Sequence, residues 1–102
     1  MEEDRLYTNP GLTLRDLSLE VGTNRNKIAD AIHNMGFAGF YEFINSYRLQ
    51  LFKELARENP AKSITELHEE AGFNSRSTFY RFFQVQESMT PNDYVNGIKT
   101  SA

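Results

Sequence analysis

The sequence contains no cysteine among its 102 residues. The chain therefore cannot form disulfides, thiolate metal sites or a cysteine nucleophile. Long hydrophobic runs are also absent, since the longest, residues 37–41, falls far below the roughly 18 residues that a membrane span requires. No secretory signal is visible. These absences fit a reducing compartment, and we expect a cytoplasmic protein.

Positive charge is scarce as well, because 11 basic residues face 14 acidic ones and the net charge is −3. Bulk attraction to nucleic acid needs the opposite sign. The charge is uneven, however: residues 1–20 sum to −3, 21–57 to +2, 58–73 to −3 and 74–102 to +1. This distribution permits nucleic-acid binding by the two positive segments but does not by itself predict it.

What the sequence does contain is an internal repeat at a separation of fifty residues. The pattern Leu/Ile-x-Asp/Glu-Leu-x-x-Glu-Val/Ala-Gly-x-Asn occurs at residues 14–24 and again at residues 64–74. Each copy predicts a short helix that stops at glycine and a second helix that starts after a polar N-cap residue. This is the layout of a helix-turn-helix, whose second helix can enter the DNA major groove. The repeat therefore predicts two DNA-reading helices on one chain.

Signals for helix starts and stops divide the first copy into two helices. Thr13 offers an N-cap oxygen, and Asp16 follows three residues later, as in a capping box. Gly22 ends this helix, and Asn24 caps the next one, which runs to about Met35. The expected apolar face of the first helix consists of Leu14, Leu17 and Val21, and that of the second of Ile28 and Ile32.

The strongest helix signal covers residues 40–58. Its apolar or long-stemmed positions form one continuous stripe, at residues 40, 43, 44, 47, 48, 51, 52 and 55. At 1.5 Å per residue this helix is roughly 28 Å long, comparable to one turn of B-DNA at about 34 Å. A rigid connector of this length would hold two recognition helices in successive major grooves.

The second copy repeats these signals. Ser63 and Gly72 bound its first helix, and either Asn74 or Ser75 opens its second. Residues 90–91 start a last short helix, with Thr as N-cap and Pro in the first helical position. The expected core face of the second helix consists of Phe79, Phe82 and Phe83.

Together these signals predict an all-α fold of seven helices and almost no strand. The acidic residues 2–7 are expected to form the first, short helix. We expect a single domain over residues 1–102, in which one helix-turn-helix subdomain (6–39), the connecting helix (40–58) and a second helix-turn-helix subdomain (59–99) follow one another.

Five motifs occur in a fixed order, namely Leu14-x-x-Leu17-Ser18-x-x-Val21-Gly22, Phe40-x-x-Phe43-Ile44-x-x-Tyr47-Arg48-Leu49, Ile64-x-x-Leu67-x-x-x-Ala71-Gly72-Phe73, Ser77-x-Phe79-x-Arg81-x-Phe83 and Met89-Thr90-Pro91-x-x-Tyr94. Over about residues 6–99 the chain thus resembles the DNA-binding domain of AraC/XylS transcriptional regulators. The resemblance implies a sequence-specific, double-stranded DNA-binding output domain of a bacterial regulator that responds to a ligand or belongs to a two-component system. It also implies an N-terminal sensor or dimerisation domain outside this chain and contact with RNA polymerase. We expect no cofactor and no metal site.

By this resemblance, the helices after Gly22 and Gly72 are the two recognition helices. Arginine can contact guanine in bidentate fashion and asparagine can contact adenine, while Ser and Thr are less selective. Helix starts at Asn24 and Asn74 can also present backbone N–H groups to phosphates. The resemblance also implies which residues face the DNA grooves. They are Arg25, Asn26, Lys27, Ala29 and Asp30 in the first helix, and Ser75, Arg76, Ser77, Thr78, Tyr80 and Arg81 in the second.

The chain departs from the family pattern at several positions. Family members often carry a basic residue where this chain has Asp30, His33 and Gln84, so we expect the second recognition helix to be the stronger reader. His68 replaces a small alanine on the apolar face of its helix. Ser88 replaces a usual glycine, so we expect a different turn geometry there.

Other interpretations of these residues stay open. The exposed basic residues also fit an ordinary solvated surface, and the inward Arg48 fits a structural ion pair or stem packing better than DNA contact. His33 and His68 fit packing or polar-edge roles better than a metal site. No constellation for catalysis emerges, so we do not expect an enzyme. The alternative function, suggested by Asp30, Gln84 and the net charge, is a helix-turn-helix protein-interaction module with weak or no DNA binding.

Overall fold

The computed structural model of the chain describes residues 6–73 and 75–101. This part contains six α-helices, one 3-10 turn and no strand. The elements are η1 (Leu6–Thr8), α1 (Leu14–Val21), α2 (Arg25–Asn34), α3 (Phe40–Glu58), α4 (Ile64–Glu70), α5 (Arg76–Glu87) and α6 (Pro91–Ser101). The all-α prediction is confirmed, except that the first of the seven expected helices is a 3-10 turn where it is described. Its expected residues 2–5, and Asn74 as an N-cap candidate, lie outside the described residues.

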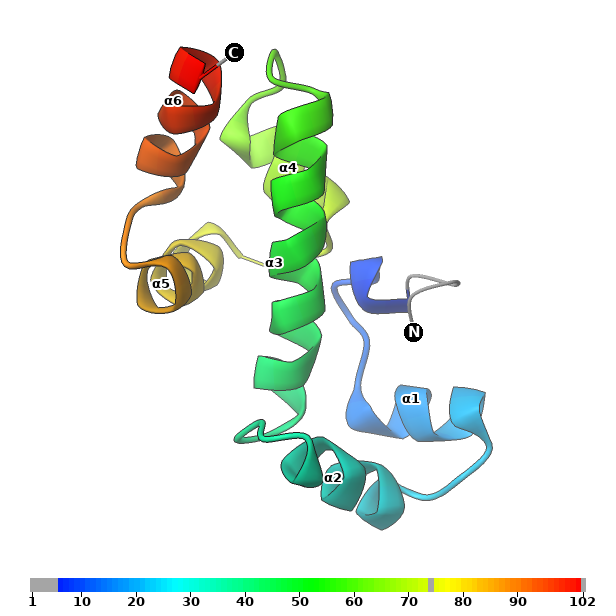
Figure 1. Cartoon of the computed structure of the whole chain (residues 1–102). Coiled ribbons are helices and arrows are strands. Elements are labelled where there is room, and N and C mark those ends of the chain that lie inside the picture. Colours follow the sequence, from blue (N-terminus) through cyan, green and yellow to red (C-terminus); the bar gives the residue numbers. More distant parts are fainter. Residues whose placement is uncertain (1–5, 74, 102) are drawn as a thin grey trace.

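Helix α3 is the axis of an elongated molecule that measures 45 × 24 × 22 Å. Figure 1 shows α1 and α2 near one end of α3, and α4, α5 and α6 packed along the rest of it. In the described part, the extensive contacts between elements either lie within one helix group or involve α3. The predicted bounds of this helix, 40–58, are confirmed, and every position of its stripe is buried or half-buried.

The predicted capping residues of the first unit are confirmed. Thr13 and Asp16 form a capping box, in which each side-chain oxygen accepts the backbone N–H of the other residue, at 3.1 and 3.2 Å. Gly22 ends α1 in the left-handed conformation with φ +80°. The Oδ1 atom of Asn24 then accepts the N–H of Lys27 at 2.9 Å and opens α2.

The helices of the second unit begin and end at the same kinds of capping residue. The hydroxyl oxygens of Ser63, Ser75 and Thr90 each accept the backbone N–H three residues later at 3.1 Å. Ser75 is therefore the N-cap of α5. Gly72 follows α4 with φ +99°. As predicted, α6 begins at Pro91.

The expectation for Ser88 is wrong. We expected the turn before α6 to adopt a different geometry without glycine, but Ser88 keeps the left-handed conformation with φ +57° and ψ +27°. Its N–H is donated to the carbonyl of Gln84 at 2.9 Å, which closes the end of α5. Beyond the turn, the ring of Tyr94 packs edge-on against Phe83 with centroids 5.6 Å apart. These contacts outweigh the local preference of serine for right-handed backbone.

Aromatic side chains of the second unit pack against α3. Phe52 on α3 and Phe79 and Phe83 on α5 have no exposed surface. The ring of Phe52 lies 4.8 Å from that of Phe79 and 5.7 Å from that of Phe83, between centroids. Lys53 forms an ion pair of 2.6 Å with Glu87 at the end of α5. Helix α5 of the second unit thus has a fixed orientation relative to α3.

The core face of α1 is shorter than predicted. Leu17 is buried and Leu14 is half-buried, but Val21 is 60% exposed. The prediction for Val21 is wrong because the helix ends at this residue, so the apolar periodicity has no further turn to pack. In α2 both Ile28 and Ile32 face the core as predicted.

No helix in the described residues is long and apolar enough to cross a membrane.

Candidate nucleic-acid interface

The first candidate recognition helix, α2, is anchored by its apolar side and open on the other. Ile32 is 3% exposed and Ile28 is half-buried. Side chains on the remaining surface carry two positive charges and one negative charge within the first two turns. The exposed residues include all five predicted contact positions, Arg25, Asn26, Lys27, Ala29 and Asp30.

The second candidate recognition helix, α5, has the same construction. Phe79 and Phe83 are fully buried and hold the helix against α3. Tyr80 is half-buried and packs against the core, so only part of its ring is accessible. The remaining predicted contact positions are all exposed, and they are Ser75, Arg76, Ser77, Thr78 and Arg81.

Some of these α5 side chains already have partners. The hydroxyl of Ser75 accepts the N–H of Thr78 and also lies 2.8 Å from Oγ1 of Thr78, so its main role is to cap the helix. The guanidinium of Arg76 lies 5.2 Å from the ring centroid of Tyr80, within cation–π range. Arg76 is thereby oriented along the surface of α5, in a position that the sequence alone did not predict.

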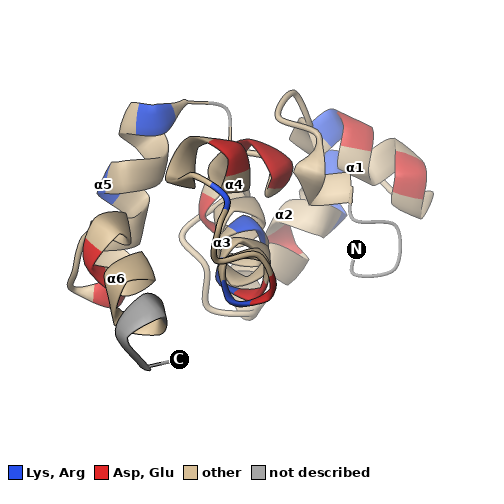
Figure 2. Ribbon diagram, turned by 90° about the horizontal axis from the view of Figure 1, so that it is seen from above, with Lys and Arg blue, Asp and Glu red and all other residues tan. Residues whose placement is uncertain are grey.

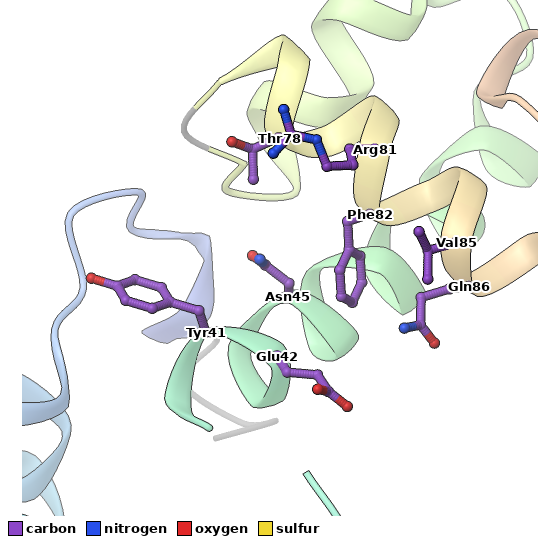
Figure 3. A pocket seen from close by; sticks show the side chains of 8 residues that line it. All are labelled: Tyr41, Glu42, Asn45, Thr78, Arg81, Phe82, Val85 and Gln86. Atoms are coloured by element: carbon purple, nitrogen blue, oxygen red, sulfur yellow. The ribbon is translucent and has the colours of Figure 1, made fainter. Parts of the chain in front are cut away.

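A groove of about 360 Å³ lies between α5 and the first turns of α3. Figure 3 shows Tyr41, Glu42 and Asn45 of α3 on one side and the α5 residues on the other. Tyr41 and Val85 are 69% and 72% exposed, large values for apolar side chains. Both were missed in the sequence, although each lies off the buried stripe of its helix. The α5 lining consists of Thr78, Arg81, Phe82, Val85 and Gln86, so the groove adjoins two predicted DNA contacts.

A smaller groove of about 260 Å³ lies beside α2. Asp30 and His33 of α2 line it together with Ala38, Gly39 and Phe40 at the start of α3. Two of the positions at which the chain departs from the family pattern thus lie at the same groove. The acid and the histidine make this side of α2 less basic than the corresponding side of α5.

The helices of each pair differ in charge. Figure 2 shows red segments on α4 and blue segments on α5, whereas α1 has both colours, from two acidic residues and one arginine. Helix α4 contains three acidic residues and no Lys or Arg. Helices α2 and α5 each contain two basic residues and one acidic residue. The two candidate recognition helices are therefore the positive members of their pairs, within a chain that is negative as a whole.

Arg48 is a structural residue, as expected, but its partners are not carboxylates. It is 4% exposed. Its Nε donates to the carbonyl of Tyr7 at 2.6 Å, its Nη2 to the carbonyl of Asn9 at 3.0 Å and its Nη1 to Oδ1 of Asn45 at 3.0 Å. Burial lowers the pKa of Arg48, but an arginine remains protonated in proteins. Its charge is thus balanced by carbonyl dipoles, and it lies too deep to contact DNA.

The two histidines behave differently. His68 is buried against Phe79, whereas His33 is exposed. Burial lowers the pKa of His68, so its neutral form is favoured in the fold. Within the described residues, no three His, Asp or Glu side chains are placed to hold a metal ion.

Comparisons with known proteins agree with this geometry. A family model described as a helix-turn-helix domain matches residues 17–97, a range that contains α2 to α5 in full. No curated protein matches the chain. A solved structure of a Listeria innocua protein of unknown function is similar, with a TM-score of 0.76 and 23% sequence identity over 91% of this chain and 87% of that one. At this identity the likeness shows the fold alone. With both helix pairs, the connector and the family match in place, the chain belongs to the helix-turn-helix DNA-binding domains of the AraC/XylS regulators.

Proposed function

We propose that this domain binds specific sites on double-stranded DNA and places α2 and α5 in successive major grooves of one face of the duplex. The observation that carries the proposal is the shared construction of the two helices. Each begins at a side-chain N-cap, each buries one apolar side, and each exposes two basic residues. The connector α3, roughly 28 Å long at 1.5 Å per residue, contacts helices of both units and can hold α2 and α5 in a fixed arrangement.

Helix α5 is the main reader in this proposal. Arg81 is exposed beside the groove, and the cation–π contact with Tyr80 limits the freedom of Arg76 before any ligand binds. A guanidinium that contacts guanine in bidentate fashion contributes about 1–3 kcal/mol of discrimination. In α2, the exposed acid Asp30 weakens the attraction of Arg25 and Lys27 to phosphates.

In the parent protein, the domain would act with an N-terminal sensor or dimerisation domain and would contact RNA polymerase when bound to DNA. The net charge of −3 supports the need for such assistance, because a single acidic domain gains little from general phosphate attraction. Pairing two domains raises the effective concentration of the second on a double site. A cytoplasmic, ligand-responsive or two-component bacterial regulator is the setting that fits these properties.

The alternative is a protein-interaction module that keeps the fold but binds DNA weakly. The exposed apolar side chains of Tyr41 and Val85 favour this alternative. They form the kind of surface on which partners of soluble proteins commonly pack.

The test is selection of preferred duplexes from random DNA, followed by titration across salt concentrations. The proposed function predicts an enriched sequence and a log affinity that falls with log salt at a slope of several units. Loss of selection together with a flat salt dependence would instead support the interaction module.

Two substitutions then test the reading helix. Arg76→Ala and Arg81→Ala should each weaken binding to the selected duplex by about 5-fold to 150-fold, which corresponds to about 1–3 kcal/mol. Arg57→Ala is the matched control, since it removes an exposed positive charge from the far end of α3. If all three variants lose affinity equally, the α5 arginines act only through net charge and not as readers.

A further inference from the structure

The segment that precedes α1 connects the two helix-turn-helix units, and Arg48 holds it in place. We infer that Arg48 is a positioning residue for DNA binding: it fixes the second recognition helix relative to the first and so determines which half-site spacing the domain accepts. This inference rests on the proposed function, because it concerns how two reading helices are placed on one duplex.

The first observation is the set of acceptors around Arg48. The guanidinium donates to the carbonyls of Tyr7 and Asn9, which lie 41 and 39 residues earlier in the chain, and to the side chain of Asn45 on its own helix. All three donor nitrogens are used, and the side chain is buried. A lysine in this position could not reach three diverging acceptors, since its ammonium is a single point.

The second observation is the close approach of this segment to the second unit. A Cβ atom on Gly72 would lie within 2.6 Å of Cα of Thr8 and even closer to the carbonyl oxygen of Tyr7. Gly72 lies in the turn that leads from α4 to α5, three residues before the N-cap Ser75. The carbonyl that Arg48 holds is therefore in backbone contact with the turn that places the second recognition helix.

The same segment continues into the first unit. The carbonyl of Asn9 accepts from Arg48 and also from the N–H of Leu12 at 3.1 Å. Leu12 is buried, and the next residue, Thr13, is the N-cap of α1. Residues 6–12 thus link the turn at Gly72 to the start of α1, with Tyr7 and Leu12 buried at the two ends of the link. Figure 1 shows η1 beside α3, between the two units.

Besides α3, which contacts helices of both units, the approach of Gly72 to Tyr7 and Thr8 connects this link to the second unit. The relative placement of α2 and α5 depends on the rigidity of α3 and on the docking of residues 6–12. Because Arg48 is buried, its substitution removes no direct contact with DNA and acts on binding through this placement. Its effect should therefore appear in the spacing preference and not in the affinity for a single half-site.

The experiment compares Arg48→Gln and Arg48→Lys with the wild type and with Arg57→Gln, which removes one positive charge from the same helix at an exposed position. The probes are the selected duplex, versions with one base pair inserted or deleted between the half-sites, and a duplex with one half-site. Circular dichroism and thermal unfolding establish that each variant is helical and folded at the temperature of the titration.

The wild type and Arg57→Gln should bind the inserted and deleted duplexes at least about tenfold more weakly than the selected one, within the usual range for a disrupted site. In Arg48→Gln this ratio should fall below about threefold, while the affinity for the single half-site stays unchanged. Arg48→Lys should be intermediate. An unchanged ratio in both Arg48 variants, or an equal loss on every duplex, overturns the inference.

A measurement without DNA separates this inference from the proposed function. The chain has no cysteine, so spin labels can be attached to Asn34→Cys on α2 and Gln84→Cys on α5, both exposed positions. The distance distribution between the labels should be narrow in the wild-type background and clearly broader with Arg48→Gln or Arg48→Lys. A narrow distribution in both variants contradicts the role of Arg48 whether or not DNA binds. Failure of the wild type to bind any duplex contradicts the proposed function only.

Discussion

The imidazole of His68 stacks on the ring of Phe79, with centroids 5.2 Å apart and planes 27° apart. His68 is 5% exposed, and its Nδ1 atom has no hydrogen-bond partner in the described structure. Burial lowers the pKa of His68; the nearby Arg76 lowers it further, whereas Glu69 raises it. The fold therefore accommodates the neutral ring and opposes its protonation.

This pair predicts a loss of stability in mild acid. Below the ordinary histidine pKa of about 6.5, the unfolded chain takes up a proton that the folded chain resists, so unfolding becomes easier as the pH falls. One such group changes the free energy of unfolding by at most about 1.4 kcal/mol per pH unit. Well above pH 6.5 both states are neutral and the contribution disappears. Urea unfolding near pH 7.5 and near pH 5.5 measures the difference.

The control for this prediction is His68→Leu, which keeps an apolar side chain in the same position. The variant should lose less stability than the wild type between the two pH values. If both proteins lose the same amount, other groups cause the acid sensitivity and His68 does not.

Two glycines in corresponding turns should respond differently to alanine. Gly22 and Gly72 both have positive φ, +80° and +99°, but no atom lies within 4 Å of a Cβ on Gly22, whereas a Cβ on Gly72 would overlap the backbone of Tyr7 and Thr8. Gly22→Ala should cost about 1–2 kcal/mol for the left-handed backbone alone. Gly72→Ala should cost more than about 3 kcal/mol, because overpacking against backbone adds to this strain. Chemical unfolding of both variants measures the difference, and equal losses would contradict the close approach.

Ser88 offers a stabilising substitution. It holds φ +57° as the one described residue other than glycine with positive φ. Ser88→Gly should remove about 1–2 kcal/mol of left-handed strain and lose about 0.4–1 kcal/mol through the freer unfolded chain, for a net gain of roughly 0.5–1 kcal/mol. Thermal unfolding checks this gain. Ser88→Val is the opposite control and should lower Tm; a lower Tm in Ser88→Gly would show that serine makes an additional stabilising contact.

Asp30→Asn tests whether α2 approaches the duplex. Asp30 is the one acid on the exposed surface of this helix. If that surface faces phosphates, removal of the carboxylate should strengthen binding to random DNA about threefold or more at low salt. Glu69→Gln on α4, also exposed, should change it less. Salt-dependent titration of both variants measures this; an identical effect of the two substitutions would indicate that α2 does not lie at the interface.

The sequence predicts those features of the fold that depend on residues close together in the chain, such as helix bounds and N-caps. The bounds of α3 and the capping roles of Thr13, Asn24 and Ser63 follow from residues within a few positions of each other, so no tertiary knowledge is needed. Ser88 shows the limit of this reasoning. Contacts of α6 hold its turn in a conformation that serine does not prefer, and they include contacts with α3, such as Lys53 over the ring of Tyr94, from a distant part of the chain.

The candidate interface also has some features that local sequence patterns predict and others that they do not. Exposure of the Arg25 and Arg81 faces follows from helical periodicity and the apolar residues opposite them. The groove beside Tyr41 requires knowledge of how α5 crosses α3, which no local pattern contains. The acceptors of Arg48 were not predictable for a similar reason, since they include main-chain carbonyls of distant residues and carbonyls leave no signature in the side-chain sequence.

The contacts of Tyr7 and Asn9 also determine whether the two halves can exist apart. A fragment that began at residue 40 would keep α3 to α6 but would leave Arg48 with Asn45 as the acceptor that remains. The fragment would also expose the surfaces of Tyr47 and Phe43 that pack against Tyr7 and Phe37, and each large apolar side chain that is uncovered costs about 1.5–3 kcal/mol, against the 5–15 kcal/mol that stabilises a small domain. The two halves should therefore unfold in one cooperative transition. The internal repeat thus gives this chain two candidate recognition helices without two autonomous folding units.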